Sequence, residues 1–298
     1  MGVNHMLHLN VTPFIYLMNS IKTYLLRGTL DNQNPLSILR ANELVWNKIF
    51  TNVDEWYQSH IIKTENAYNV ISNRFFYPIQ FPEPTGININ MMPIRICDPS
   101  SYPDFIKPYL PLIRACCRFT FDDKIVYLTI QESEVPIHQT QRRSGLHIER
   151  PGILEQGGKM YKEDFKNPEY RGLAWGSGLY CGDIPVDGIF MASSVSNTCQ
   201  IWPVQIENPH EVTDTHGGLE PMRPYLGEPY KIQKNELVWL TDTTPHEALP
   251  VEQPVYRQFF RLIMGRISTW YSQHNTPNPT GLLPDAPISD ENKFELMS

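Results

Sequence analysis

The 298-residue sequence predicts an α+β fold in which a helical start precedes a β-rich remainder. Apolar residues near the N-terminus recur at three- and four-residue intervals, which is typical of amphipathic helices. The chain carries 26 prolines and 15 tyrosines, a composition that favours turns and short strands over a helical bundle. Runs rich in β-branched and aromatic residues then recur from residue 124 onward, as expected for strands.

The first 75 residues are predicted to be mainly helical. One apolar stripe spans residues 14–25, a second spans residues 35–50, and a third, shorter piece contains Trp56 and Tyr57.

Proline-rich residues 77–111 exclude long helices, although residues 102–115 are predicted to contain a helical turn or two. The C-terminal residues 276–298 are predicted to form an extended or mobile tail. The later runs predicted as strands are residues 124–131, 188–194, 198–204, 237–240 and 255–263.

The net charge, the length of the apolar runs and the cysteine spacing argue against nucleic-acid-binding, membrane-spanning and zinc-binding proteins. A formal charge of -7 gives no electrostatic reason to expect nucleic-acid binding, and no apolar run is long enough to cross a bilayer. The N-terminus lacks the pattern of a signal peptide. Five scattered cysteines, without zinc-site spacing, indicate reduced thiols. We therefore expect a soluble cytoplasmic protein whose partner is a small molecule, while the sequence leaves its oligomeric state open.

The stretch from Gly145 to Gly152 contains the pattern most suggestive of chemistry. His147 and Glu149 are two residues apart, so on a β-strand both side chains leave the same face. With His246 as a third ligand, they would form the two-histidine, one-carboxylate triad of non-haem Fe(II) oxygenases. The alternative is that His147 and Glu149 merely satisfy each other on a half-buried strand.

The last predicted strand, residues 255–263, places Arg257, Phe259 and Arg261 on one face. Two arginines close behind a candidate metal ligand are costly to bury unless an anion meets them. A guanidinium group binds a carboxylate through two parallel hydrogen bonds, so a carboxylate ligand is expected here.

Together these residues resemble the 2-oxoglutarate/Fe(II)-dependent oxygenase superfamily, over roughly residues 120–267. The resemblance implies that His147, Glu149 and His246 bind Fe(II), which is also where catalysis occurs. It implies that Arg257 holds the far carboxylate of 2-oxoglutarate, with Arg261 in reserve. The implied reaction is oxidation of a small organic substrate by O₂, coupled to decarboxylation of 2-oxoglutarate; amino-acid-like or acidic substrates are among the candidates.

The resemblance also implies a double-stranded β-helix (jelly-roll or cupin-like) core with N-terminal helices packed on one sheet. We expect one domain over residues 1–298: a helical and loop part (1–120), a β-helix core (121–267) and a C-terminal tail (268–298). Most family members carry Asp where this chain has Glu149, although some Jumonji-type members use Glu. The 99-residue span from His147 to His246 leaves room for an insertion over the barrel mouth.

Three further arginines, Arg142, Arg143 and Arg150, lie around the His147 segment and could attract an acidic substrate group. Solvated or ion-paired surface positions are an equally good explanation for each. His210 and His216 lie in a polar, glycine-rich loop and are expected to be exposed.

Two other functions remain open at the level of the sequence. One is a cupin-type metal dioxygenase or oxidase that needs no 2-oxoglutarate, in which Arg257 binds the carboxylate of the substrate. The other is a non-catalytic ligand-binding barrel in which Glu149 marks a decayed site. Formation of succinate that depends on Fe(II) distinguishes the three.

Overall fold

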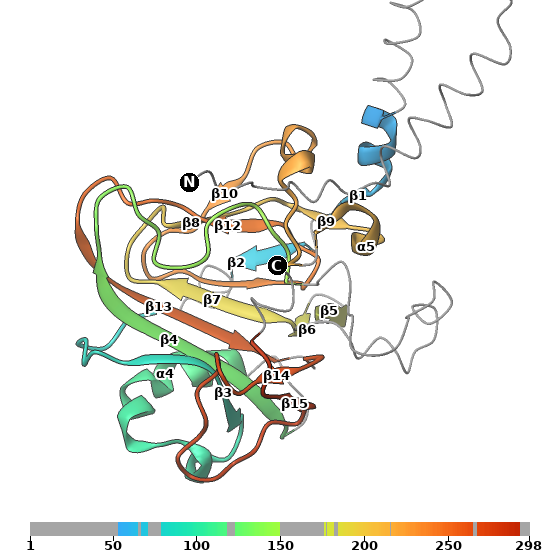
Figure 1. The fold of residues 1–298 in the computed structure, drawn as a ribbon. Coiled ribbons are helices and arrows are strands. Elements are labelled where there is room, and N and C mark those ends of the chain that lie inside the picture. The colour runs from blue at the N-terminus through green and yellow to red at the C-terminus, as the bar shows by residue number, and fades with distance from the viewer. Residues whose placement is uncertain are drawn as a thin grey trace, which may run out of the picture.

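In the described residues the sheets are mostly antiparallel and the helices are few, as the computed structural model shows (Figure 1). The structure describes residues 53–64, 67–70, 79–117, 123–149, 176, 178–181, 184–214, 216–264 and 267–292. The helices predicted at residues 14–25 and 35–50 therefore lie outside the described residues. Residues 53–59, around Trp56 and Tyr57, do form a short helix.

The largest sheet has six strands, and every neighbouring pair in it is antiparallel. Its long central pair joins segments far apart in the sequence, because Phe260 lies opposite Ile130. In spatial order the strands are β2 (Tyr68–Val70), β11 (Leu237–Leu240), β7 (Ile189–Ser193), β13 (Val255–Ile263), β4 (Ile125–Val135) and β3 (Asn88–Arg95).

A second, three-stranded antiparallel sheet carries the downstream histidine. Its order is β10 (Tyr230–Lys231), β8 (Cys199–Ile201) and β12 (His246–Ala248). The remaining strands form three pairs: β1 (Ile61–Lys63) with β9 (Val204–Ile206), β5 (Gly178–Cys181) with β6 (Ile184–Asp187), and β14 (Trp270–Tyr271) with β15 (Ile288–Ser289).

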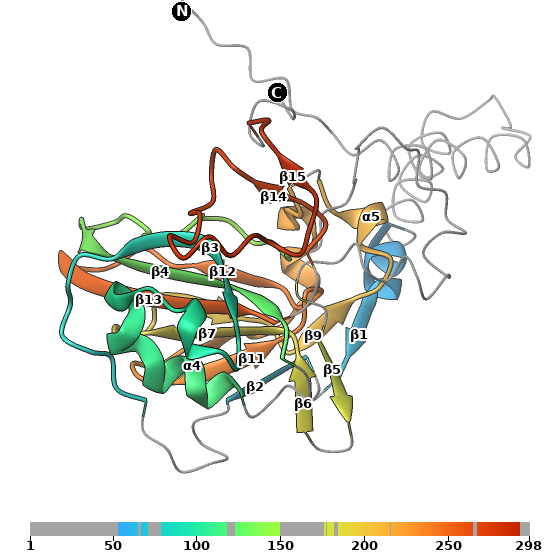
Figure 2. The ribbon, with the colours of Figure 1, turned by 90° about the horizontal axis from the view of Figure 1, so that it is seen from below.

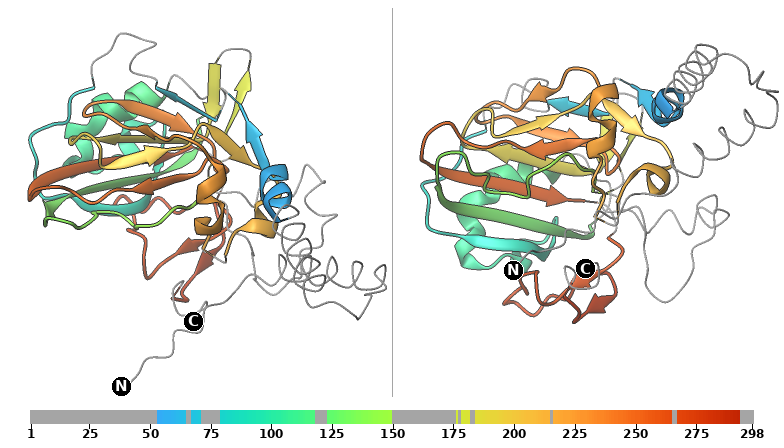
Figure 3. Two further views of the ribbon diagram at one scale, coloured as in Figure 1. Left: turned by 90° about the horizontal axis from the view of Figure 1, so that it is seen from above. Right: turned by 45° about the horizontal axis from the view of Figure 1, so that its top comes forward.

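Helical turns cover the outer face of the six-stranded sheet, as Figures 2 and 3 show for α4. The layer consists of η1 (Pro99–Ser101), η2 (Asp104–Tyr109) and α4 (Leu110–Cys117). Ile106, Leu112 and Ile113 pack there against strand residues such as Phe260 and Trp239, all of them fully buried. Within the described residues this helical layer comes from 99–117, where a helical turn or two was predicted for 102–115. The packing predicted for the helices at 14–25 and 35–50 lies outside the described residues. Two further short helices, α5 (Pro209–Val212) and η5 (Glu220–Tyr225), lie elsewhere on the chain.

The inner face of the six-stranded sheet meets the three-stranded sheet. Met191 and Phe259 of the larger sheet share one apolar cluster with Cys199 and Ile201 of the smaller sheet. The same two sheets also line a cavity of about 400 Å³. Met191, Cys199 and Phe259 belong to both, so the apolar cluster forms part of the cavity wall.

One prediction for secondary structure was wrong and another was incomplete. The first 75 residues, predicted to be mainly helical, also contain β1 and β2, which are strands that pair with β9 and β11. These partners lie more than a hundred residues downstream, so no local pattern reveals the pairing. Residues 198–204 do not form one strand: β8 ends before Pro203, which has no N–H to donate to a ladder, and β9 then pairs with β1.

The described C-terminal segment is extended, as predicted, and its residues 270–278 are docked on β3. The indole Nε1 of Trp270 donates to the Met91 carbonyl at 2.8 Å. The Asn278 amide donates to the carbonyls of Pro93 and Ser101, each at 2.8 Å. Among the residues described, none of the helices has the length and apolar character that a membrane crossing requires.

Candidate metal centre

His147 is held by two isolated β-bridges, to Gly218 and to His246, rather than by a strand. Its N–H donates to the His246 carbonyl at 3.0 Å, and the His246 N–H donates back at 2.9 Å. Gly145 precedes it with a φ of +87°, a conformation that favours glycine. In place of a strand around His147, the described residues thus form these two bridges, and residues 150–152 lie outside the described part.

His246 opens β12, immediately after a tight turn of threonines. The Thr244 hydroxyl donates to the Ala67 carbonyl at 2.6 Å and accepts from the Thr241 N–H at 3.2 Å. The Glu149 N–H donates to the Asp242 carbonyl of the same turn at 3.1 Å. This turn thus fixes the backbone next to both His246 and Glu149.

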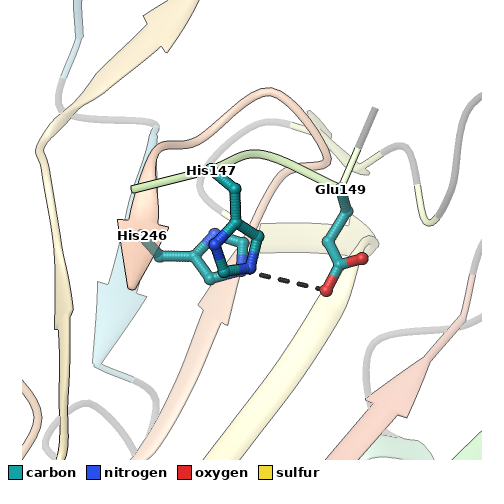
Figure 4. A group of neighbouring side chains, drawn as sticks. All are labelled: His147, Glu149 and His246. Carbon is teal, nitrogen blue, oxygen red and sulfur yellow. Dashed lines mark ion pairs between the residues drawn. The ribbon is translucent and has the colours of Figure 1, made fainter. Parts of the chain in front are cut away.

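The three side chains converge, as predicted (Figure 4). One potential ligand atom from each of His147, Glu149 and His246 lies within 4.8 Å of the others. The His246 Nε2 atom is 3.8 Å from the Glu149 Oε1 atom, and the two imidazole centroids are 4.6 Å apart. In the described part of the chain, no other group of three histidine, cysteine or acidic residues has this geometry.

Both imidazoles are held in the tautomer that a metal requires. The Nδ1 atom of His147 lies 2.7 Å from the Gly145 carbonyl, and that of His246 lies 2.9 Å from the Thr244 carbonyl. A carbonyl can only accept a hydrogen bond, so each Nδ1 carries a proton. Nε2 is then the atom whose lone pair is available, and a backbone partner for the other ring nitrogen is the usual arrangement around bound metals.

The charges of the site also favour a metal. Burial lowers the pKa of His147 to about 3, and the adjacent His246 acts in the same direction, so His147 is neutral at pH 7. Burial alone would raise the pKa of Glu149, but Arg261 and the two histidines outweigh burial and hold it well below the ordinary value. The neutral imidazole of His147 and the carboxylate of Glu149 are therefore both present at neutral pH.

Arg261, predicted as a reserve anchor for an anion, forms an ion pair with Glu149 in the structure. Its Nη1 atom contacts Oε1, the same carboxylate oxygen that faces His246. Arg261 is 8% exposed, so this pair is screened little by solvent. Glu149 therefore already has a cationic partner next to the candidate metal position.

Arg257 and Phe259 face the same cavity as Arg261, as the strand alternation predicted. Arg257 is 1% exposed, and its Nε atom donates to the Ser193 hydroxyl at 3.0 Å. Its guanidinium carbon lies 5.3 Å from the centroid of Phe259. Burial lowers the pKa of Arg257 to about 10, which still leaves it charged at pH 7. No carboxylate of the described residues is paired with it.

Two of the three arginines predicted to attract a substrate line the cavity. Arg142 is half-buried, donates to the Gln131 Oε1 atom at 3.2 Å and lies over the Phe259 ring. Arg143 is exposed and donates to the His216 carbonyl at 2.7 Å. His216, which we expected to be exposed, lines the cavity as well. Arg150 lies outside the described residues.

The sequence analysis missed one wall of the cavity. Asn90 donates from Nδ2 to the Asn275 Oδ1 atom at 3.0 Å, and Tyr271 and His274 lie beside them on the cavity wall. These residues come from β3 and from the docked C-terminal segment. The polar composition of that segment indicated a tail, and only its contacts with β3 bring it to the site.

No protein-family model matches the sequence, and no curated protein matches it. Among solved structures, the chain matches the crystal structure of HygX from Streptomyces hygroscopicus with iron bound, with 11% sequence identity. The match covers 60% of this chain and 83% of the HygX chain, with a TM-score of 0.29. A TM-score this low does not establish a shared fold. The assignment of a candidate metal centre therefore depends on the side chains themselves.

Proposed function

We propose that the protein is a non-haem Fe(II)- and 2-oxoglutarate-dependent oxygenase that oxidises a small organic substrate. One observation carries the proposal: His147, Glu149 and His246 converge on the wall of a cavity, with both imidazole Nε2 atoms free to bind a metal. Two histidines and one carboxylate with open positions are typical of this class. The facing antiparallel sheets around the cavity support a double-stranded β-helix core.

The donor set suits a small divalent ion after a modest contraction. Ligand bonds of roughly 2.0–2.2 Å place neighbouring donors about 3 Å apart, whereas His246 Nε2 and Glu149 Oε1 are 3.8 Å apart. Rotation of the Glu149 side chain can close this gap. With three protein ligands, three positions remain for a chelating 2-oxo acid and O₂. Bound Fe(II) would supply the oxidation of a substrate C–H bond, coupled to conversion of 2-oxoglutarate and O₂ to succinate and CO₂.

Arg257 is the residue that we propose to hold the far carboxylate of 2-oxoglutarate. It is buried, charged, and without a carboxylate partner among the described residues. A buried charge is stable only when it is paired, so a ligand carboxylate would remove a substantial penalty. The hydrogen bond to Ser193 fixes its Nε atom and leaves the terminal nitrogens to bind that carboxylate.

Arg261 has a different role in this proposal. Because it contacts Glu149, it orients the metal-binding carboxylate and does not serve as a second anchor for 2-oxoglutarate. Such outer partners of metal ligands commonly set the affinity of a metal site.

The test is succinate formation by the purified protein with Fe(II), 2-oxoglutarate and O₂, beside measurement of 2-oxoglutarate binding to the Mn(II) form. We expect succinate only when Fe(II) and O₂ are both present, and 2-oxoglutarate binding only when Mn(II) is present. Oxygen consumption without 2-oxoglutarate would instead indicate an independent oxidase. Failure to bind Mn(II) and 2-oxoglutarate, with no succinate formed, would contradict the proposal.

A further inference from the structure

The cavity is cationic although the protein as a whole is acidic. Among the described residues, its charged lining consists of four guanidinium groups, from Arg142, Arg143, Arg257 and Arg261, and one carboxylate, from Glu149. The whole chain has a formal net charge of -7. Cationic side chains concentrated in a cavity of an acidic protein attract anions selectively to that cavity.

Bound metal and co-substrate would not remove this excess of positive charge. Arg261 and Glu149 already neutralise each other. A divalent metal and the 2-oxoglutarate dianion also cancel in formal charge. Arg257 would contact the far carboxylate of 2-oxoglutarate, and Arg142 would then have no anion of its own.

Arg142 is built into the cavity wall rather than lying free on the surface. Its Nη1 atom donates to the neutral Gln131 Oε1 atom at 3.2 Å, and its guanidinium carbon lies 5.2 Å from the Phe259 ring centroid. The Gln131 and Phe259 positions face each other across the β4–β13 ladder. Within the described residues, Arg142 has no carboxylate partner, so two of its three guanidinium nitrogens remain for a ligand.

We propose that the substrate carries a carboxylate that Arg142 binds, and that Arg142 thereby determines substrate specificity. This inference depends on the proposed function, because it assigns the 2-oxoglutarate carboxylate to Arg257. The substrate is a small amphipathic acid: the cavity holds about 400 Å³, near the lower end of ligand pockets. Met91, Met191 and Ala248 provide apolar wall for the hydrocarbon part.

The test uses small carboxylates and their uncharged amides as probes. Protein loaded with Mn(II) and 2-oxoglutarate is titrated with phenylacetate or phenylacetamide, and with butanoate or butanamide. Broadening of the probe proton resonances by Mn(II) reports binding near the metal. We expect each carboxylate to bind roughly tenfold or more tightly than its amide, because a charge-assisted hydrogen bond is gained.

Three variants distinguish a specific contact between Arg142 and the probe carboxylate from a general effect of positive charge on the protein. Arg142→Gln should abolish the preference for carboxylates while Mn(II) and 2-oxoglutarate binding persist, which also shows that the variant is folded. Arg142→Lys keeps the charge but loses the planar fork, so a partial preference is expected. Arg114→Gln removes the same charge from the exposed face of α4 and should leave the preference unchanged.

The outcomes are distinguishable. Wild-type protein that does not bind Mn(II) or 2-oxoglutarate overturns the proposed function and this inference with it. If both bind but carboxylates gain nothing over amides, or if the preference survives Arg142→Gln, only the inference about the substrate is wrong.

Discussion

Buried polar side chains on the two faces of strand β13 differ in how many hydrogen bonds they form with other protein groups. On the face toward the helices, Gln258 uses its Nε2 atom to donate to Pro82, Tyr109 and Glu132. On the face toward the cavity, Arg257 is even more buried, and within the described residues its side chain has one hydrogen bond, to the Ser193 hydroxyl. Two adjacent residues of one strand thus differ in whether other protein groups satisfy the hydrogen-bonding capacity of their side chains.

Two carboxylates next to these faces, the buried Glu132 and the half-buried Glu149, show the same contrast. Glu132 accepts hydrogen bonds from the backbone N–H groups of residues 85–87 and from the Tyr109 hydroxyl, all neutral donors. Glu149 is held by Arg261 and faces His246 at 3.8 Å. Native interiors leave few polar groups unsatisfied. The hydrogen bonds around Glu132 are complete and therefore structural, whereas the less complete set around Glu149 and Arg257 indicates a ligand site.

The largest expected effect is on metal binding through Glu149. Glu149→Gln removes the charge that offsets the metal, and affinity for Mn(II) should fall roughly a hundredfold or more, since even outer partners commonly contribute up to that factor. Glu149→Asp keeps charge and donor type with a shorter reach, so part of the affinity and turnover should remain. Titration of Mn(II) into all three proteins measures this. Equal affinities in the three would remove the basis for the oxygenase proposal.

Arg257→Gln should raise the concentration of 2-oxoglutarate needed for half-saturation roughly tenfold to a hundredfold, because a charge-assisted pair is lost. Metal content should stay the same, since Arg257 does not contact the three candidate ligands. Binding of 2-oxoglutarate to the Mn(II) form, with metal measured on the same sample, checks both statements. An unchanged requirement for 2-oxoglutarate would assign the anchor to another residue.

Glu132→Gln should affect stability and leave the metal site intact. The variant weakens several hydrogen bonds to a buried carboxylate, so we expect a loss of about 1–3 kcal/mol in the free energy of unfolding at pH 7. Tyr109, the backbone N–H groups and Gln258 together outweigh burial and lower the pKa of Glu132. The contribution of Glu132 to the free energy of unfolding is therefore present above the pKa of this group in the unfolded chain, near 4.5, and is lost as the pH falls below that value.

Denaturant unfolding of wild type and Glu132→Gln at pH 7 and at pH 3.5 tests this. The difference between the two proteins should shrink at the lower pH. Weaker Mn(II) binding by a folded Glu132→Gln protein would contradict the separation of the two faces.

The smallest effect is expected at Arg261. Arg261→Gln removes the cation that pairs with Glu149 and orients its carboxylate. We expect Mn(II) to bind severalfold more weakly and the metal-free protein to unfold at a lower temperature. Calorimetric titration and thermal unfolding measure the two effects. Tighter Mn(II) binding would show that Arg261 competes with the metal for Glu149 instead of orienting it.

Local sequence patterns predicted much of the sheet that supports the site. Residues 237–240 and 255–263 were predicted as strands and coincide with β11 and β13, because their β-branched and aromatic residues specify a strand without help from neighbours. The short strands β1 and β2 were missed. Each has three residues and depends on a partner brought close only by the complete fold.

The three candidate metal ligands could be predicted from the sequence, whereas most of the contacts around them could not. The two-residue spacing of His147 and Glu149, and the turn before His246, indicated a metal triad that the structure brings together. The ion pair between Arg261 and Glu149 joins positions 112 residues apart, and Asn275 reaches the cavity from a segment without strand character. Such contacts depend on tertiary packing and leave no local signal.

The most direct measurement is a crystal structure of the protein with Mn(II) and 2-oxoglutarate. The account predicts one metal bound by His147 Nε2, His246 Nε2 and a Glu149 carboxylate oxygen, at roughly 2.0–2.2 Å. The 2-oxo acid should chelate that metal, and its far carboxylate should contact Arg257. A metal bound elsewhere, or three side chains that stay apart in the presence of saturating Mn(II), would contradict the account.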